Sequence, residues 1–200
     1  MSGLKFVFCE GGDDVAVIRG VAESISLPDV RVEPFQGKNQ LGKFLASVLT
    51  RPEFAQNKVE SIAIVRDADE NEQAAFRSVC DSLSANKLAS PASNGGVVSL
   101  GMKVGVLVIG PNAGQGMIED LCLLSVANRP EFRCVEEYFS CIRANRPKSD
   151  AKNFSSKAKV RVWMASQADH EFHVGKAAEH GYWPWESPAF DRLKEFLKSL

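Results

Sequence analysis

The chain has 200 residues, of which 44% are apolar and 24% are charged, and its formal net charge at pH 7 is −1. Such a chain can bury an ordinary globular core, and its balanced charge excludes binding to nucleic acid or acidic membranes through overall charge alone. No run approaches the roughly 20 apolar residues of a membrane helix, and the first residues lack the pattern of a signal peptide. The five cysteines form no Cys-x-x-Cys pair. We therefore expect a cytoplasmic protein with reduced cysteines and no membrane partner.

Strand-like and helix-like segments alternate in the first two thirds of the chain. Short apolar runs predict four strands, at residues 4–9, 30–35, 61–66 and 103–109, the last one preceded by a hairpin strand at 97–100. Apolar residues at helical spacing predict helices at residues 13–26, 41–49, 75–83 and 117–127. This alternation indicates βαβ units. The predicted fold class is α/β, with a four-stranded, mostly parallel sheet flanked by helices.

After about residue 128 only helical patterns remain. Apolar stripes predict helices at residues 135–142 and 157–167. A last helix is expected to begin with Ser187 as its N-cap and Pro188 at its first position. Trp183 and Trp185 precede it and are interpreted as a packed connector. We expect an α/β core at residues 1–127 and a helical C-terminal extension at 128–200 that packs on the core.

Three carboxylates follow two of the predicted strands. Glu10 follows the first strand, and Asp67 and Asp69 follow the third strand in the form Asp-Ala-Asp. Ligands of open α/β sheets sit beyond the carboxyl ends of parallel strands, so these acids can meet at one place. Crowded carboxylates raise one another's pKa unless a cation joins them, and hard oxygen ligands favour Mg²⁺ or Mn²⁺. Taken singly, each acid also fits a helix cap or a surface loop.

The residues around these acids resemble two motifs of the Toprim domain. Residues 6–11, with Asp13 and Asp14, resemble its apolar strand that ends in Glu-Gly, and residues 64–69 resemble its Asp-x-Asp motif. Residues 116–120 and 182–190 resemble uncharacterised bacterial Toprim-like proteins related to the overcoming-lysogenization-defect (OLD) nucleases. The Toprim part of the resemblance would cover about residues 3–127. It implies that Glu10, Asp67 and Asp69 hold Mg²⁺.

The chain departs from the topoisomerase and primase branches of that family. The pattern Asp-x-Asp-x-Gly is common in topoisomerases, whereas Asp69 is followed here by Glu70 and Asn71. We also expect no strand-passage or zinc domain in these 200 residues. The nuclease-like branch is what the resemblance leaves.

A glycine-rich turn before residue 117 is a second candidate site. Gly114 and Gly116 would let backbone N–H groups approach an anion or cofactor, as would Gly11 after the first strand. Glu119 falls in the first turn of the following helix. On residues alone, these glycines and Glu119 equally fit a plain turn and a favourable helix dipole. The resemblance to Toprim-like proteins favours Glu119 as a metal ligand.

Three further patterns bear on function. Residues 37–44 nearly form a P-loop, but Phe44 replaces the Ser or Thr that binds Mg²⁺, so we predict no ATP site and place Lys38 near the metal instead. Lys159 lies in the most basic segment and resembles one lysine of a pair in the Toprim-like relatives, which makes it a candidate to stabilise transition-state charge. The three histidines lack a zinc-ligand spacing and are interpreted as surface residues.

The sequence thus favours a Mg²⁺- or Mn²⁺-dependent phosphodiesterase with nuclease-like activity on nucleic acid. Its expected catalytic residues are Glu10, Asp67, Asp69 and Lys159, and Glu119 completes the metal ligands. The alternative is a non-catalytic regulatory module that binds a nucleotide or a partner. A protein partner or a homo-oligomer stays open.

Overall fold

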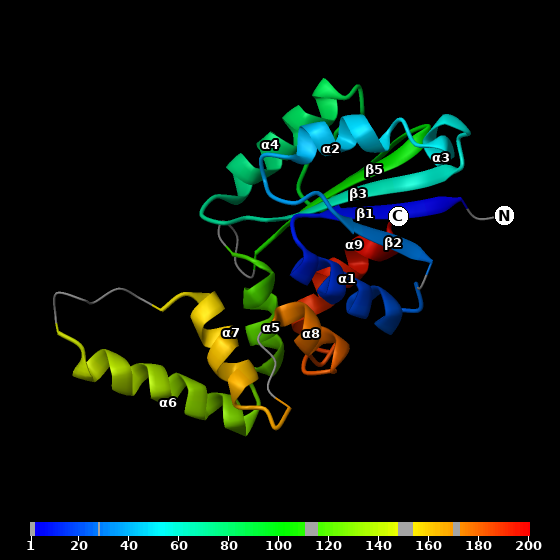
Figure 1. The fold of residues 1–200 in the computed structure, drawn as a ribbon. Coiled ribbons are helices and arrows are strands. Elements are labelled where there is room, and N and C mark those ends of the chain that lie inside the picture. The colour runs from blue at the N-terminus through cyan, green and yellow to red at the C-terminus, as the bar shows by residue number, and fades with distance from the viewer. Residues whose placement is uncertain (1–2, 28, 111–115, 148–153, 170–172) are drawn as a thin grey trace.

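A five-stranded sheet runs through the middle of the computed structural model, which describes residues 3–27, 29–110, 116–147, 154–169 and 173–200 (Figure 1). The strands are β1 (Leu4–Cys9), β2 (Val30–Pro34), β3 (Val59–Asp67), β4 (Val97–Leu100) and β5 (Met102–Ile109). Their order across the sheet is β2-β1-β3-β5-β4. All neighbours are parallel except β4, which pairs antiparallel with β5. The expected α/β fold is confirmed. The sheet has one strand more than expected, because the hairpin strand joins the open edge of β5.

The helices match the predicted stripes, with two short additions. In chain order they are α1 (Gly12–Ser24), α2 (Leu41–Val48), α3 (Pro52–Ala55), α4 (Glu72–Ala85), α5 (Ile118–Val126), α6 (Pro130–Asn145), α7 (Ser156–Ala165), α8 (Val174–Glu179) and α9 (Asp191–Lys198). The short α3 and α8 were not predicted, because four and six residues are too few to show a helical period. The Ser187 hydroxyl accepts a hydrogen bond from the Ala189 N–H, as expected of an N-cap, but Pro188 opens a 3₁₀ turn before α9 begins. No helix in the described ranges is long and apolar enough to cross a membrane.

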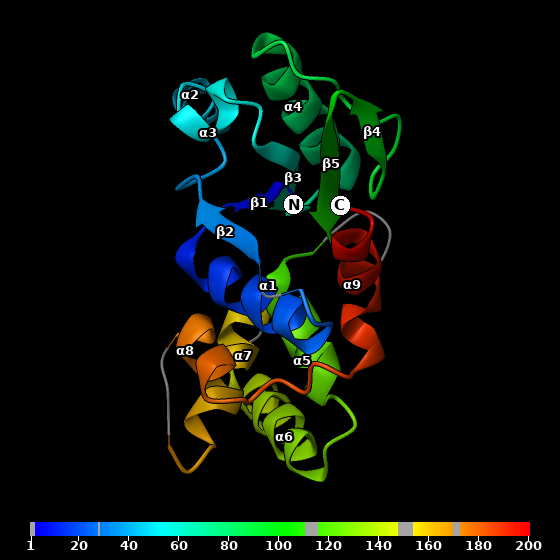
Figure 2. The ribbon, with the colours of Figure 1, turned by 90° about the vertical axis from the view of Figure 1, so that its right-hand side faces the viewer.

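The sheet separates two apolar cores. Alternate residues of β1 serve each of them: Phe6 and Phe8 pack under α2 and α4, whereas Val7 and Cys9 face α1, α5 and α9. Figures 1 and 2 show these two groups of helices on opposite faces of the sheet. The carboxyl ends of β1 and β3 lie where the first turns of α1 and α5 begin, so side chains that follow these strands can meet side chains from both helices.

The C-terminal helices belong to the same core as the sheet. Phe196 of α9 and Leu200 lie against β5, where Gly105 leaves room for them: a Cβ at Gly105 would come within 2.9 Å of Phe196. The segment before α9 is a packed connector, as predicted. Trp183 is buried, and the Trp185 ring lies directly over Gly20 of α1. The predicted extension therefore packs on the core, whereas a domain boundary at residue 127 stays a prediction.

Candidate functional site

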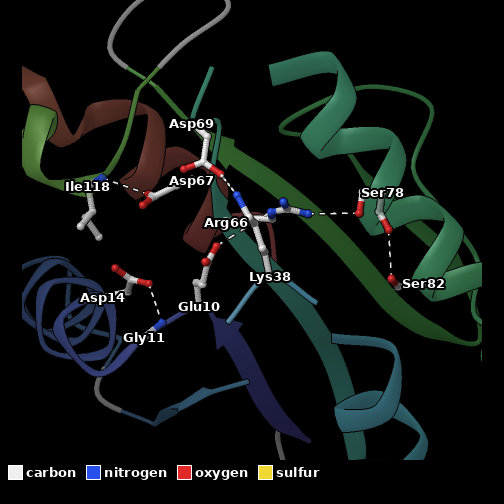
Figure 3. A network of polar contacts seen from close by, with 10 residues as sticks. All are labelled: Glu10, Gly11, Asp14, Lys38, Arg66, Asp67, Asp69, Ser78, Ser82 and Ile118. Carbon is white, nitrogen blue, oxygen red and sulfur yellow. Dashed lines mark hydrogen bonds and ion pairs between the residues drawn. The ribbon is translucent and has the colours of Figure 1, made fainter. Parts of the chain in front are cut away.

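Four carboxylates gather at the carboxyl ends of the two central strands. Glu10 follows β1 and Asp67 ends β3, and these strands pair in parallel with Phe8 opposite Ile64. Asp14 comes from the first turn of α1 and Glu119 from the first turn of α5. Figure 3 shows the carboxylates of Glu10, Asp14 and Asp67 turned toward one space. Each acid thus comes from a different secondary-structure element, and the strand ends place them as the sequence predicted for Glu10 and Asp67.

The gathered acids change one another's pKa. Burial, and then the charges of Asp14, Glu119 and Glu10, raise the pKa of Asp67 to about 8, although a hydrogen bond from the Ile118 N–H to Asp67 Oδ1 (3.0 Å) opposes the rise. Burial also raises the pKa of Asp14 to about 6, against a 2.8 Å hydrogen bond from the Gly11 N–H. The expectation that crowding raises a carboxylate pKa is confirmed, with burial as the larger cause.

Asp14 is the acid that sequence reasoning did not place in the site. In the sequence, Asp14 was named only as part of the motif that follows Glu10. An acid in the first turn of a helix interacts favourably with the helix dipole, so its presence there did not by itself indicate a site. The spacing held a usable signal. Asp14 lies four residues after Glu10, so the first turn of α1 brings its side chain back toward the end of β1.

Asp69 lies to one side of these four acids. Its backbone bridges to Gly116, it has a left-handed φ of 50°, and its carboxylate is 3.3 Å from Lys38 Nζ. Glu10 is held in a similar way by Arg66, whose Nε is 3.9 Å from Glu10 Oε2. Within the described ranges, no group of three or more His, Cys, Asp or Glu residues is arranged so that it could hold a metal ion. A single cation shared by Glu10, Asp67 and Asp69 therefore stays a prediction.

The donor set fits a hard divalent cation in its chemistry. All the clustered side chains are carboxylates, which are the ligands that Mg²⁺ and Mn²⁺ prefer. Glu10 Oε2 is buried and accepts no hydrogen bond from any described residue. A buried carboxylate oxygen without a donor is unfavourable unless a cation or proton satisfies it.

The backbone N–H groups of two of the predicted glycines donate hydrogen bonds within the chain. The Gly11 N–H donates to Asp14, and the N–H of Gly116 donates to the Asp69 carbonyl. Gly114 lies outside the described residues. Cofactor binding by these glycines stays a prediction, and the N-terminus of α5 instead donates to Asp67 through Ile118.

One lysine of the basic segment reaches the acids. Lys157 Nζ, in the first turn of α7, lies 3.7 Å from Glu119 Oε1. Lys159 is half-buried in the same helix, and the described residues include no hydrogen bond or ion pair between it and the clustered acids. Its catalytic role stays a prediction. Lys157 was visible in the sequence, but only the docking of α7 on α5 tells the two lysines apart.

The segment that resembles a P-loop, residues 37–44, contributes to the apolar core. Phe44 packs on Phe8, with ring centroids 5.0 Å apart, so this position serves the apolar core under α2. Lys38 lies against Asp69, as its predicted place near the acids requires. His173 and His180 flank the short helix α8, and His170 lies outside the described residues.

Comparison with known proteins identifies a family. The model of the family described as protein of unknown function (DUF3226) matches residues 4–200. This chain belongs to the DUF3226 family. No curated protein matches this DUF3226 chain.

Two solved structures of the C-terminal region of the Xanthomonas campestris pv. campestris OLD protein are similar to it. The one phased with iodine is 12% identical with a TM-score of 0.51, and the alignment covers 98% of this chain and 95% of that chain. The one phased with platinum is 12% identical with a TM-score of 0.49, covering 98% and 93%. At this identity the likeness shows a shared fold.

Proposed function

We propose that this DUF3226 protein is a Mg²⁺- or Mn²⁺-dependent phosphodiesterase that cleaves nucleic acid. The observation that carries the proposal is the convergence of Glu10, Asp14, Asp67 and Glu119 at the carboxyl ends of adjacent central strands. Four like charges from four elements destabilise one another, and a divalent cation offsets that repulsion. The Toprim-like motifs around Glu10 and Asp67 and the fold shared with the OLD region support the same assignment.

The residues of the chain have separate roles in this proposal. Glu10, Asp67 and Asp69 would hold the ion or ions, with Asp14 and Glu119 beside them. The Ile118 N–H keeps the Asp67 carboxylate fixed against α5. Lys157 offsets the charge of Glu119, and Lys159, on the same helix, is proposed to stabilise negative charge on the phosphate in the transition state. When bound, a divalent ion supplies phosphate orientation, a hydroxide nucleophile and stabilisation of the leaving oxygen.

The test is a cleavage assay on single- and double-stranded DNA and RNA with Mg²⁺ and with Mn²⁺. We expect wild-type turnover that Asp67→Ala lowers by more than about a hundredfold, since lost charge stabilisation of several kcal/mol corresponds to such a factor. Glu136→Ala, which removes an exposed acid of α6, is the matched control and should keep the wild-type rate.

Two outcomes of the cleavage assay would contradict the proposal, each in a different way. Equal activity in wild type and Asp67→Ala would show a contaminating nuclease. No activity on any substrate, together with Mn²⁺ binding that depends on Asp67, would favour the non-catalytic binding module.

A further inference from the structure

A cavity lined by Lys38 and Arg66 lies next to the acid cluster, which it meets where Arg66 contacts Glu10. It has a volume of about 560 Å³, a size typical of small-ligand sites, and opens to solvent beside the end of β3. Lys38 and Arg66 supply its positive charge, and Asn71 and Ala74 belong to the N-terminus of α4. Asp69 also lines it.

Arg66 lines this cavity in an arrangement that is unfavourable for the folded protein. Its side chain is only 9% exposed, and its Nη1 donates to Ser78 Oγ at 3.2 Å. Its Nε has no hydrogen-bond acceptor among the described residues and is 3.9 Å from Glu10 Oε2, which also accepts no hydrogen bond. A buried guanidinium with an unused donor stays unfavourable until an anion accepts from it. Its five fixed donors match the oxygens of a phosphate.

The other groups around the cavity add to this preference. The first turn of α4 lies at its wall, with the Ala74 N–H donating to Asn71 Oδ1 at 2.9 Å, so the positive end of the helix dipole faces the same space. Lys38 is half-exposed and lies 3.3 Å from Asp69. Asp69 and Glu70 are the acids on the wall. A divalent ion that engaged Asp69 and Glu10 would release Lys38 and Arg66 from their ion pairs.

We propose that this cavity binds a phosphate of a polynucleotide next to the phosphate that the acid cluster cleaves. The inference rests on the proposed function for the identity of the neighbouring site. Arg66 joins the two places, because it lines the cavity and its Nε is 3.9 Å from Glu10 Oε2 of the acid cluster. A ligand with phosphates repeated along a chain can therefore reach both. A mononucleotide with a single phosphate fills one of them. The substrate class is therefore an extended single strand or strand end rather than a free nucleotide.

The experiment measures binding rather than cleavage. Fluorescence anisotropy follows a labelled ten-nucleotide single strand, as DNA and as RNA, with Ca²⁺ in place of Mg²⁺, over a series of salt concentrations. Lys38→Gln should weaken binding by about threefold to tenfold and reduce the slope of log affinity against log salt by about 0.7, the value for one lost contact to a single strand. Arg66→Lys keeps the charge but loses the guanidinium fork and should weaken binding by about tenfold.

Lys58→Gln is the matched control. Lys58 is exposed and lies just before β3, at the opposite end of the strand from Arg66, so this variant should bind as wild type does. Unchanged affinity and salt slope in both Lys38→Gln and Arg66→Lys would overturn the inference, as would the absence of any binding by the wild type. If Arg66→Lys does not fold, as judged by circular dichroism, Lys38→Gln decides alone.

A competition arm separates the two sources of phosphate. Inorganic phosphate and AMP should displace the labelled strand only at concentrations at least about a hundredfold above those of an unlabelled ten-nucleotide strand, since they make one of several phosphate contacts. Equal displacement by AMP would overturn the assignment to a polynucleotide. Cleavage by wild type with unaltered binding in both variants refutes the phosphate cavity alone. Binding that depends on Lys38 without any cleavage refutes the nuclease alone.

Discussion

Asp67 is the acid on which burial and like charge act together most strongly, so removing its charge should stabilise the metal-free protein. Asp67→Asn keeps an oxygen that accepts from the Ile118 N–H. Because the pKa of Asp67 is about 8, we expect the variant to have a free energy of unfolding roughly 1–3 kcal/mol above wild type at pH 8 and similar to wild type near pH 4.

Urea denaturation without divalent ions measures this difference. Glu136→Gln, at an exposed position of α6, should match wild type at both pH values. If the variant were no more stable than wild type at pH 8, ionisation of Asp67 would not destabilise the folded protein, and the prediction would be wrong.

At single positions, the sequence predicted the acids that follow strands and missed side chains placed by tertiary packing. Glu10 and Asp67 could be found because parallel strand ends share one edge. Asp14 could not be separated from an ordinary first-turn acid without knowing how α1 is turned. Arg66 lies in a strand buried on both faces, where alternation of apolar and polar residues gives no sign of which core a side chain enters.

Between elements, the contact of α9 with β5 depends on the missing side chain of Gly105. Gly105→Val should lower the free energy of unfolding by about 2 kcal/mol or more, because a Cβ would come within 2.9 Å of Phe196 and 3.1 Å of Leu200. Thermal unfolding followed by circular dichroism measures the change.

Gly42→Ala is the opposite case and the control. Gly42 lies in helix α2, and a Cβ added there would meet no atom within 4 Å, so alanine should stabilise the protein by about 0.5–1 kcal/mol. If both variants lost stability equally, the packing of α9 on Gly105 would not be the cause.

The long periodic helices and strands were predictable from the sequence, but which elements pair or pack with one another was not. The stripes of α1, α4 and α5 and the apolar runs of β1 and β3 each carry their own period. Strand β4 was recognised as half of a hairpin, but its pairing in the main sheet depends on the open edge of β5, which no local pattern records.

For the whole molecule, divalent ions and pH should act on stability together. Asp14 and Asp67 have pKa values of about 6 and about 8 in the folded protein, above their ordinary value of 3.8. Both groups are protonated in the folded protein below about pH 4, and there they do not lower its free energy of unfolding. As the pH rises through about 6 and about 8 they ionise in a buried site, and the free energy of unfolding falls. Since ligands bind metal when deprotonated, Mn²⁺ should raise the melting temperature more at pH 8 than at pH 5.

Differential scanning calorimetry with and without millimolar Mn²⁺ tests this coupling. Asp67→Asn should show a smaller Mn²⁺ effect than wild type at pH 8. A melting temperature that rises equally at pH 5 and pH 8 would speak against a carboxylate site for the metal.

The arrangement of α9 also has a consequence for synthesis on the ribosome. Strand β5 ends at Ile109, but Leu193, Phe196 and Leu197, which cover that face of the sheet, follow more than roughly 80 residues later. At about 5–20 residues per second, the apolar face waits some seconds for its last cover. During that interval α1 already covers part of this face, but the part of β5 that α9 will cover stays exposed, the kind of apolar surface that chaperones bind.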